Sequence, residues 1–89
     1  MEYKIVPTKT FERTLKKLDR AVAKRALAKI NKLRNNTGEI IRLHFTPKGL
    51  EGLYKYKIGE WRVLLWLDES KKEITLYRVG HRKEIYRNL

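Results

Sequence analysis

Basic side chains in the C-terminal half of the chain have types and a spacing that could do chemistry on an anion. Gly59-Glu60 suits a two-residue β-hairpin loop with glycine first, and a loop of this length pairs Lys57 with Arg62. Side chains alternate between the two faces of a strand, so Lys55, Lys57 and Arg62 share one face. Like charges opposite one another destabilise a sheet. The pattern therefore indicates a face that attracts an anion, although Lys55 and Lys57 also fit the solvated side of an ordinary amphipathic strand.

The segments that would carry these cations are typical of a three-stranded antiparallel meander, since they are rich in Tyr, Trp, Ile, Val and Leu with turn signals between them. The strands are expected at residues 53–58, 61–67 and 73–79. The third strand returns the chain to the start of the second, so the segment after it leaves the sheet beside Arg62. Arg82 can therefore reach the cluster, His81 is a further candidate, and Tyr86 follows on the tail.

The opposite face of the hairpin is expected to pack on two helices. It carries the apolar and aromatic side chains Tyr54, Tyr56, Ile58, Trp61, Val63 and Leu65. In the N-terminal half, a short β-type run at residues 3–6 ends at Pro7. Thr8 or Thr10 can then cap a helix that begins near Phe11.

A second helix is expected from Arg20 to about Asn35, with Asp19 as its N-cap. One apolar stripe recurs along it at helical spacing, formed by Val22, Ala23, Ala26, Leu27, Ile30 and Leu33. Two helices joined at Asp19 form a helical hairpin. The expected fold is α+β: an N-terminal strand, a two-helix hairpin packed on a small antiparallel sheet, and the C-terminal three-strand meander.

Length and composition restrict the classes of protein to which the chain can belong. A chain of 89 residues forms one domain, residues 1–89. Its 22 Lys and Arg against 10 Asp and Glu give a net charge of +12, which attracts nucleic acid, ribosomes, anionic membranes or acidic proteins. The lack of cysteine excludes disulfides and cysteine-based metal sites or nucleophiles. No apolar run is long enough for a signal peptide or a membrane span, so the protein is expected to be cytoplasmic.

Two runs of sequence resemble the RelE/ParE toxin superfamily, and RelE-type toxins in particular. Residues 53–64, Leu-Tyr-Lys-Tyr-Lys-Ile-Gly-Glu-Trp-Arg-Val-Leu, are similar to the family's Tyr-Lys-x-Lys hairpin and the aromatic-Arg-hydrophobic strand after it. Residues 79–86, Val-Gly-His-Arg-Lys-Glu-Ile-Tyr, are similar to its C-terminal Gly-x-Arg motif with a terminal Tyr. The resemblance implies a RelE-like fold and, at the matching positions, the catalytic set Lys55, Lys57, Arg62, Arg82 and Tyr86.

The resemblance also implies a function. RelE toxins enter the ribosomal A site and cleave the bound mRNA, and a cognate acidic antitoxin, such as RelB, blocks them. The chain would then be the toxin of a type II toxin–antitoxin system, an endoribonuclease that inhibits translation. Its partners would be a RelB-like antitoxin, the ribosome and mRNA, and it would need no metal or other cofactor.

The chemistry of such a site starts from the ribose 2′-hydroxyl, which attacks the adjacent phosphate. Arg62 and Arg82 would stabilise the charge that develops, because a guanidinium binds two phosphate oxygens at once. Crowded cations disfavour one another's charged forms, so a lysine could accept the proton; Tyr86 is the other candidate base. His81 is either an auxiliary acid or base or a tail residue hydrogen-bonded to the backbone. The site has no metal ligands, so positioning of the RNA by the ribosome is expected to supply part of the catalysis.

Two other functions stay open. A ParE-type inhibitor of DNA gyrase would share the architecture without cleaving RNA, although ParE proteins generally lack the Lys-x-Lys and Arg set. A non-catalytic RNA-binding module would bind RNA and leave it intact. The tail after Tyr86 is short, which leaves the place of that residue open. Trp61 and Trp66 are expected in the core rather than as base-stacking platforms, and His44 on the surface or in a packing role.

Overall fold

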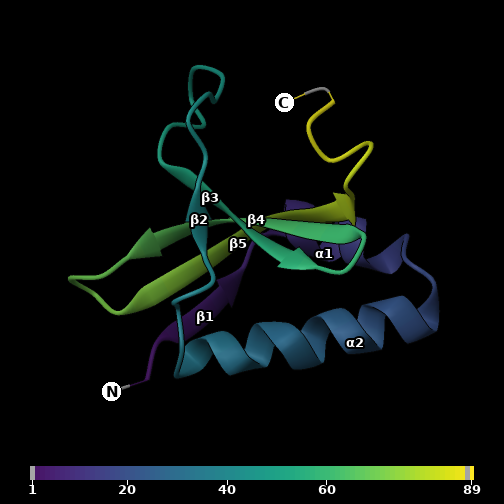
Figure 1. Cartoon of the computed structure of the whole chain (residues 1–89), viewed down its shortest axis with the longest axis horizontal. Helices are drawn as coiled ribbons and strands as arrows, with labels where there is room; N and C mark the ends of the chain where they lie inside the picture. Colours follow the sequence, from purple (N-terminus) through teal and green to yellow (C-terminus); the bar gives the residue numbers. More distant parts are fainter. Residues whose placement is uncertain (1, 88) are drawn as a thin grey trace.

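The computed structural model describes residues 2–87 and residue 89. Its elements are β1 (Lys4–Pro7), α1 (Lys9–Lys16), α2 (Arg20–Asn31), the 3₁₀ helix η1 (Lys32–Arg34), β2 (Ile41–Arg42), β3 (Leu53–Ile58), β4 (Trp61–Asp68) and β5 (Glu73–His81). The strands form one five-stranded sheet in the order β1-β5-β4-β3-β2. Both helices pack against one face of this sheet (Figure 1). The predicted α+β class is confirmed, with the short edge strand β2 as an addition.

The helices begin at residues whose side chains cap them. The Thr8 hydroxyl accepts from the Phe11 N–H at 3.1 Å, so Thr8 rather than Thr10 caps α1. The Asp19 carboxylate accepts from the Ala21 N–H at 3.2 Å and caps α2, as predicted. The helix α2 ends at Asn31 and continues as the 3₁₀ helix η1. The last turn of the predicted helix, which was expected to reach about Asn35, is therefore 3₁₀ rather than α.

The prediction of an entirely antiparallel sheet is wrong at one edge. The meander β3–β4–β5 is antiparallel, but β1 pairs with β5 in the parallel direction, from Lys4 beside Glu73 to Pro7 beside Leu76. Side chains alternate between faces in the same way in parallel and antiparallel strands. The pattern of residues 3–6 could therefore predict a strand but not its direction.

The β3–β4 hairpin has the predicted register. Lys57 lies opposite Arg62 and Ile58 opposite Trp61, with Gly59 at a φ of +58° in the turn, where glycine has no steric cost. The predicted inner side chains of the hairpin pack with Phe11, Ala26 and other helix residues in the main core. We call the opposite side of the sheet, which faces away from the helices, the outer face.

The outer face carries a second, smaller apolar cluster that the sequence analysis did not predict. Leu53 and Leu64 are fully buried there, and Ile85 from the C-terminal segment covers them. Trp66 and Tyr77 are half-buried and pack against this cluster. The outer face is therefore not a simple solvated surface.

A β-bulge interrupts the pairing of β4 with β5. Leu64 lies opposite Arg78 and Leu65 opposite Leu76, so Tyr77 is an extra residue in β5. A bulge lets two successive side chains point to the same side of a sheet. Tyr77 contacts Trp66 in the outer cluster, and Arg78 lies across from Leu64 of the same cluster. The bulge therefore places both Tyr77 and Arg78 on the outer face.

Within the part of the chain that the structure describes, neither helix is long and apolar enough to cross a membrane.

Replacing Thr8 by alanine is expected to lower the free energy of unfolding by about 1–2 kcal/mol. The Thr8 hydroxyl caps α1 and also donates to the Leu76 carbonyl at 2.8 Å, so it joins the helix to the sheet. Urea unfolding of Thr8→Ala measures the loss. Thr10→Ala is the matched control, because Thr10 offered the alternative cap; an equal loss in both variants would contradict this assignment.

Candidate functional site

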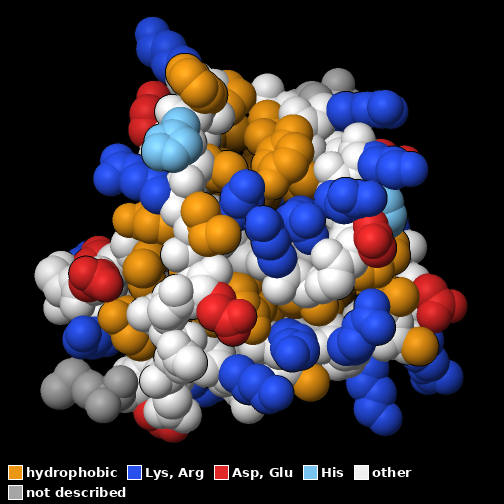
Figure 2. Space-filling model, viewed as in Figure 1, with side chains coloured by type: hydrophobic (Ala, Val, Ile, Leu, Met, Phe, Trp, Pro, Cys, Tyr) orange, Lys and Arg blue, Asp and Glu red, His pale blue; other side chains and the backbone are white. Residues whose placement is uncertain are grey.

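Three of the predicted site residues meet on the outer face. Lys57 lies directly across from Arg62, and Lys55 is two residues along β3 on the same face. Lys57 is exposed, and Lys55 and Arg62 are half-buried. Lys and Arg side chains gather in a band across this part of the surface (Figure 2). The predicted cationic cluster is therefore present as a feature of the sheet.

Arg78 is a fourth cation on this face, and the sequence analysis missed it. It lies opposite Leu64, which in turn lies opposite Lys55, so the three form one row across β3, β4 and β5. Strict alternation along β5 would not have predicted this position, because the bulge shifts the pattern. A feature of the sequence could have indicated the bulge. The buried side chains Ile74, Leu76 and Val79 are spaced by two residues and then by three. We call Lys55, Lys57, Arg62 and Arg78 the cationic cluster.

The members of the cationic cluster differ in how they are held. Arg62 donates from Nη1 to the carbonyl oxygens of Gly59 and Trp61, at 2.7 and 2.8 Å. These bonds fix the guanidinium at the hairpin turn and leave its other N–H groups for an anion. Among residues 2–87, no ion pair or side-chain hydrogen bond engages Lys55, Lys57 or Arg78. The cluster thus combines one fixed guanidinium with three cations that are available to a ligand.

Arg82 lies at the tip of the hairpin and is engaged by Glu60. Its backbone N–H donates to the Glu60 carbonyl at 2.8 Å, and its Nε forms an ion pair with the Glu60 carboxylate. The two side chains are 51% and 62% exposed. An ion pair this exposed contributes little to stability, so a phosphate could replace the carboxylate at small cost.

The C-terminal segment bends back over the outer face because residue 80 has no side chain. Gly80 lies opposite Arg62, and a Cβ atom at Gly80 would lie 3.2 Å from Cδ1 of Ile85. The glycine therefore gives Ile85 its place in the outer cluster. Tyr86 follows directly and is 43% exposed.

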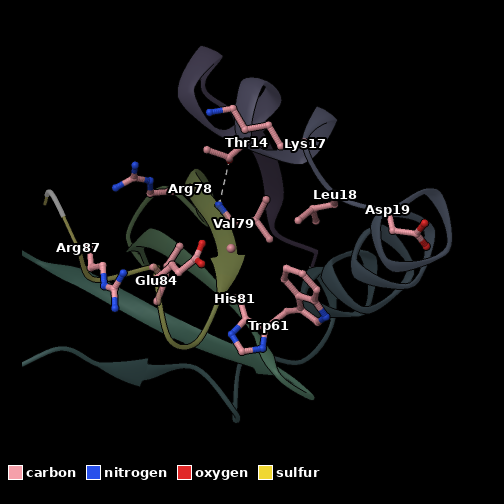
Figure 3. Close-up of a pocket in the computed structure, with 12 residues that line it drawn as sticks. Thr14, Lys17, Leu18, Asp19, Trp61, Arg78, Val79, His81, Glu84 and Arg87 are labelled. Carbon is pink, nitrogen blue, oxygen red and sulfur yellow. Dashed lines mark hydrogen bonds between the residues drawn. The ribbon is translucent and has the colours of Figure 1, made fainter.

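His81 lies on the other side of the sheet from Lys55, Lys57 and Arg62. It pairs with Trp61, and their rings meet edge to face with centroids 5.3 Å apart. Its Nδ1 accepts from the Lys83 N–H at 3.2 Å, in line with a tail residue hydrogen-bonded to the backbone. Figure 3 shows His81 and Trp61 side by side in a cavity of about 770 Å³ between α1 and the C-terminal segment. His81 and Arg78 both line this cavity, so the structure separates His81 from Lys55, Lys57 and Arg62 but not from Arg78.

Other sequence predictions concern residues at the margin of this site. His44 is exposed in the β2–β3 loop, in keeping with a surface position. Trp61 packs against the main core, as predicted. Trp66 packs instead against the smaller apolar cluster of the outer face, beside Tyr77, with ring centroids 5.2 Å apart. Among the residues described, no three His, Asp or Glu side chains lie close enough together to hold a metal ion.

Comparisons with known proteins support one family. Residues 5–86 match the model of the ParE toxin of type II toxin–antitoxin systems. No curated protein gives a significant match.

Solved structures of RelE-type toxins share the fold. The RelBE2 toxin–antitoxin complex of Mycobacterium tuberculosis is similar at 23% identity, over 94% of this chain and 95% of that one, with a TM-score of 0.76. The RelE–RelB complex of Pyrococcus horikoshii is similar at 22% identity, over 94% and 99% of the two chains, with a TM-score of 0.74. The RelB–RelE complex of Methanococcus jannaschii is similar at 25% identity, over 91% and 94%, with a TM-score of 0.64.

Glu60→Gln is expected to make binding of single-stranded RNA more dependent on salt. Releasing Arg82 would let it neutralise one more phosphate, which steepens the slope of log affinity against log salt by about 0.7. Fluorescence anisotropy titrations over a range of salt concentrations measure this slope. Glu69→Gln, an exposed site in the β4–β5 turn, makes the same charge change without freeing an arginine. Identical slopes for the two variants would show that Arg82 does not become available.

Proposed function

The chain belongs to the ParE toxin family of type II toxin–antitoxin systems, within the RelE/ParE superfamily, and from this premise we propose that it is a ribosome-dependent endoribonuclease. In this proposal the protein enters the ribosomal A site and cleaves the bound mRNA. The observation that carries the proposal is the cationic cluster: Lys55, Lys57 and Arg78 are available beside a fixed Arg62. A toxin that acts only by binding gyrase has no evident need for this arrangement.

The cationic cluster suits a phosphoryl transfer that uses the RNA's own nucleophile. The 2′-oxygen forms a bond to phosphorus while the bond to the 5′-oxygen of the next nucleotide breaks. The products are a 2′,3′-cyclic phosphate and a free 5′-hydroxyl. Extra negative charge develops on the phosphate oxygens in the transition state, and fixed cations directed at these oxygens stabilise it. Arg62 and Arg78 can each donate two parallel hydrogen bonds.

Two protons must move in this reaction. One leaves the 2′-hydroxyl, and Lys55, Lys57 and the exposed Tyr86 are the candidate acceptors. The other reaches the departing 5′-oxygen, for which a second protonated lysine is the natural donor. His81 is not assigned either role, because its ring lies against Trp61 on the other side of the sheet.

Dependence on the ribosome follows from what the isolated site lacks. The cationic cluster offers charge, whereas alignment of the 2′-oxygen, the phosphorus and the leaving oxygen can contribute about 7–11 kcal/mol. The exposed cations of the helices suit contacts with ribosomal RNA: Arg13, Lys16, Lys17, Arg20, Lys24, Arg25 and Lys29. The ribosome would thus supply the geometry and the protein the charge.

An acidic antitoxin is the second proposed partner. The similar structures named above include toxins in complex with RelB antitoxins. On this chain, an apolar groove runs between β1 and the two helices, lined by Ile5, Phe11, Leu15 and Leu27 among others. Leu27 is 46% exposed. An amphipathic antitoxin helix could cover this groove, while its acidic side chains neutralise the net charge of +12.

Inhibition of DNA gyrase is the second candidate function, and the match to the ParE toxin model favours it. The fold is shared by both kinds of toxin, so it does not decide between them. A gyrase inhibitor would leave mRNA intact on the ribosome and would block DNA supercoiling by purified gyrase.

Purified protein is expected to cut mRNA in the A-site codon of stalled ribosomes and to leave free mRNA uncut. Arg78→Ala should slow this cleavage about 100-fold, as expected for loss of one transition-state donor. Primer extension maps the cuts and their rate. Lys71→Ala, an exposed lysine in the β4–β5 turn, should cut like the wild type. Absence of cuts with every protein, together with inhibition of supercoiling, would replace this proposal with the gyrase function.

Expression of the protein without an antitoxin is expected to stop growth, and the double variant Arg62→Ala, Arg82→Ala is expected to be harmless. Arg82 pairs with an exposed carboxylate and Arg62 donates to turn carbonyls near the surface, so the double variant should still fold. Growth curves measure toxicity, and circular dichroism of the purified variant checks the fold. A folded double variant that retains full toxicity would exclude the proposed mechanism.

A further inference from the structure

An aromatic pair lies on the outer face and has no part in the cleavage mechanism. The rings of Trp66 and Tyr77 are 5.2 Å apart and tilted at 59°. Both side chains are half-buried, so part of each ring is accessible to solvent. Aromatic surface left partly accessible beside a charged site is a common feature of surfaces that bind a ligand.

The aromatic pair lies one step along the sheet from the cationic cluster. Trp66 is two residues after Leu64 on β4, and Leu64 lies between Lys55 and Arg78 in its row. Tyr77 directly precedes Arg78. Residues two apart on a strand are about 6.6–6.8 Å apart, which is about the reach from a nucleotide's phosphate to its base. The rings and the cations can therefore contact one nucleotide together.

Two segments flank the aromatic pair and hold it in place. On one side is the β2–β3 loop, where the Trp66 indole N–H donates to the Glu51 carbonyl at 3.0 Å. The Glu51 carboxylate accepts from the Gly49 N–H at 2.9 Å, a bond that lowers the pKa of Glu51. On the other side is the C-terminal segment with Ile85. Figure 2 shows apolar surface between these two projecting segments, with Lys and Arg side chains just below it.

We propose that Trp66 and Tyr77 form a stacking subsite for an unpaired nucleobase of single-stranded RNA, beside the phosphate held by Lys55 and Arg78. The inference rests on the proposed function, because it takes RNA as the substrate, and adds the way in which the RNA is held. Base–aromatic stacking tolerates every base, since each has a flat π face. Such a subsite would fix a nucleotide next to the scissile phosphate without reading its sequence.

RNA fits this surface better than an acidic peptide does. The only polar group of the indole is already bonded to Glu51, so Trp66 offers a ligand its ring alone. An acidic peptide could pair with the cations, but it would gain nothing specific from two flat rings beside them. A nucleotide uses both features at once, with its phosphate on the cations and its base on the rings.

The test measures whether the gain in affinity from the bases of an oligonucleotide depends on the aromatic rings of the protein. Two short single-stranded oligonucleotides of equal length are compared, one with bases and one abasic, and neither has a free 2′-hydroxyl, so neither can be cleaved. Wild-type protein should bind the oligonucleotide with bases about tenfold more tightly. Trp66→Leu, which keeps an apolar side chain and removes the ring, should lose this preference and bind the abasic oligonucleotide as the wild type does.

Matched variants separate stacking from structural damage. Trp66→Phe keeps a ring and should keep most of the preference, and Tyr77→Leu tests the second ring if Trp66→Leu fails to fold. Trp61→Phe changes the tryptophan on the opposite face and leaves Trp66 as the one remaining indole. Its fluorescence should be quenched by the oligonucleotide with bases and unaffected by the abasic one.

The outcomes distinguish this inference from the proposed function. If Trp66→Leu bound both oligonucleotides more weakly than the wild type by the same factor, the stacking subsite would be overturned. The same holds if neither Trp66→Leu nor Tyr77→Leu bound the oligonucleotide with bases more weakly. Either result would leave the patch as a surface for a protein partner. Cleavage in the A site without ring–base coupling would keep the ribonuclease function and remove the subsite. Coupling without cleavage would keep the subsite and remove the ribonuclease function.

Discussion

The two-residue turn at Gly59-Glu60 sets the register of β3 against β4, and the positions of the cations depend on that register. A slip of one residue would move every side chain of one strand to the other face and carry Lys55 and Lys57 into the core. The turn also holds the site directly: the Gly59 carbonyl accepts from Arg62, and Glu60 binds Arg82 through both its backbone and its carboxylate. One short turn thus fixes two guanidinium groups and the strand that carries the lysines.

The outer face must hold like charges together, and its second apolar cluster makes this possible. Lys57 and Arg62 oppose each other directly, which weakens a strand pair. Leu53, Leu64 and Ile85 pack on the same face and bury apolar surface there, which offsets the repulsion. Because Gly80 leaves room for Ile85, the same contact also brings the C-terminal segment back towards the cations. The apolar cluster that stabilises the sheet and the proposed site therefore share one surface in this domain.

Local chemistry was predictable from the sequence, and contacts between distant segments were less so. The helix caps, the hairpin register and the gathering of Lys55, Lys57 and Arg62 follow from short-range rules, and the structure confirms them. The direction of β1 does not follow from its pattern, because it depends on a partner at the other end of the chain. Arg78 was missed because the bulge breaks strict alternation. The change in spacing of the apolar residues along β5, from two residues to three, is the sign of this bulge in the sequence. The ion pair of Arg82 with Glu60 and the edge-on packing of His81 on Trp61 depend on where the tail leaves the sheet.

The electrostatics of the domain point to a site that is complete only in the presence of a polyanion. A net charge of +12 on 89 residues is self-repulsive, and in the described part of the chain Glu60 provides the single carboxylate that forms an ion pair. That carboxylate belongs to the hairpin turn itself and pairs with Arg82, a cation of the C-terminal segment. An RNA phosphate that displaced the Glu60 carboxylate would free Arg82 to act with the cationic cluster. Binding of the substrate would then itself bring a further positive charge to the site. In the proposed function, a ribonuclease assembled in this way would be weak in free solution and strongest where phosphates are densest, as in the ribosomal A site.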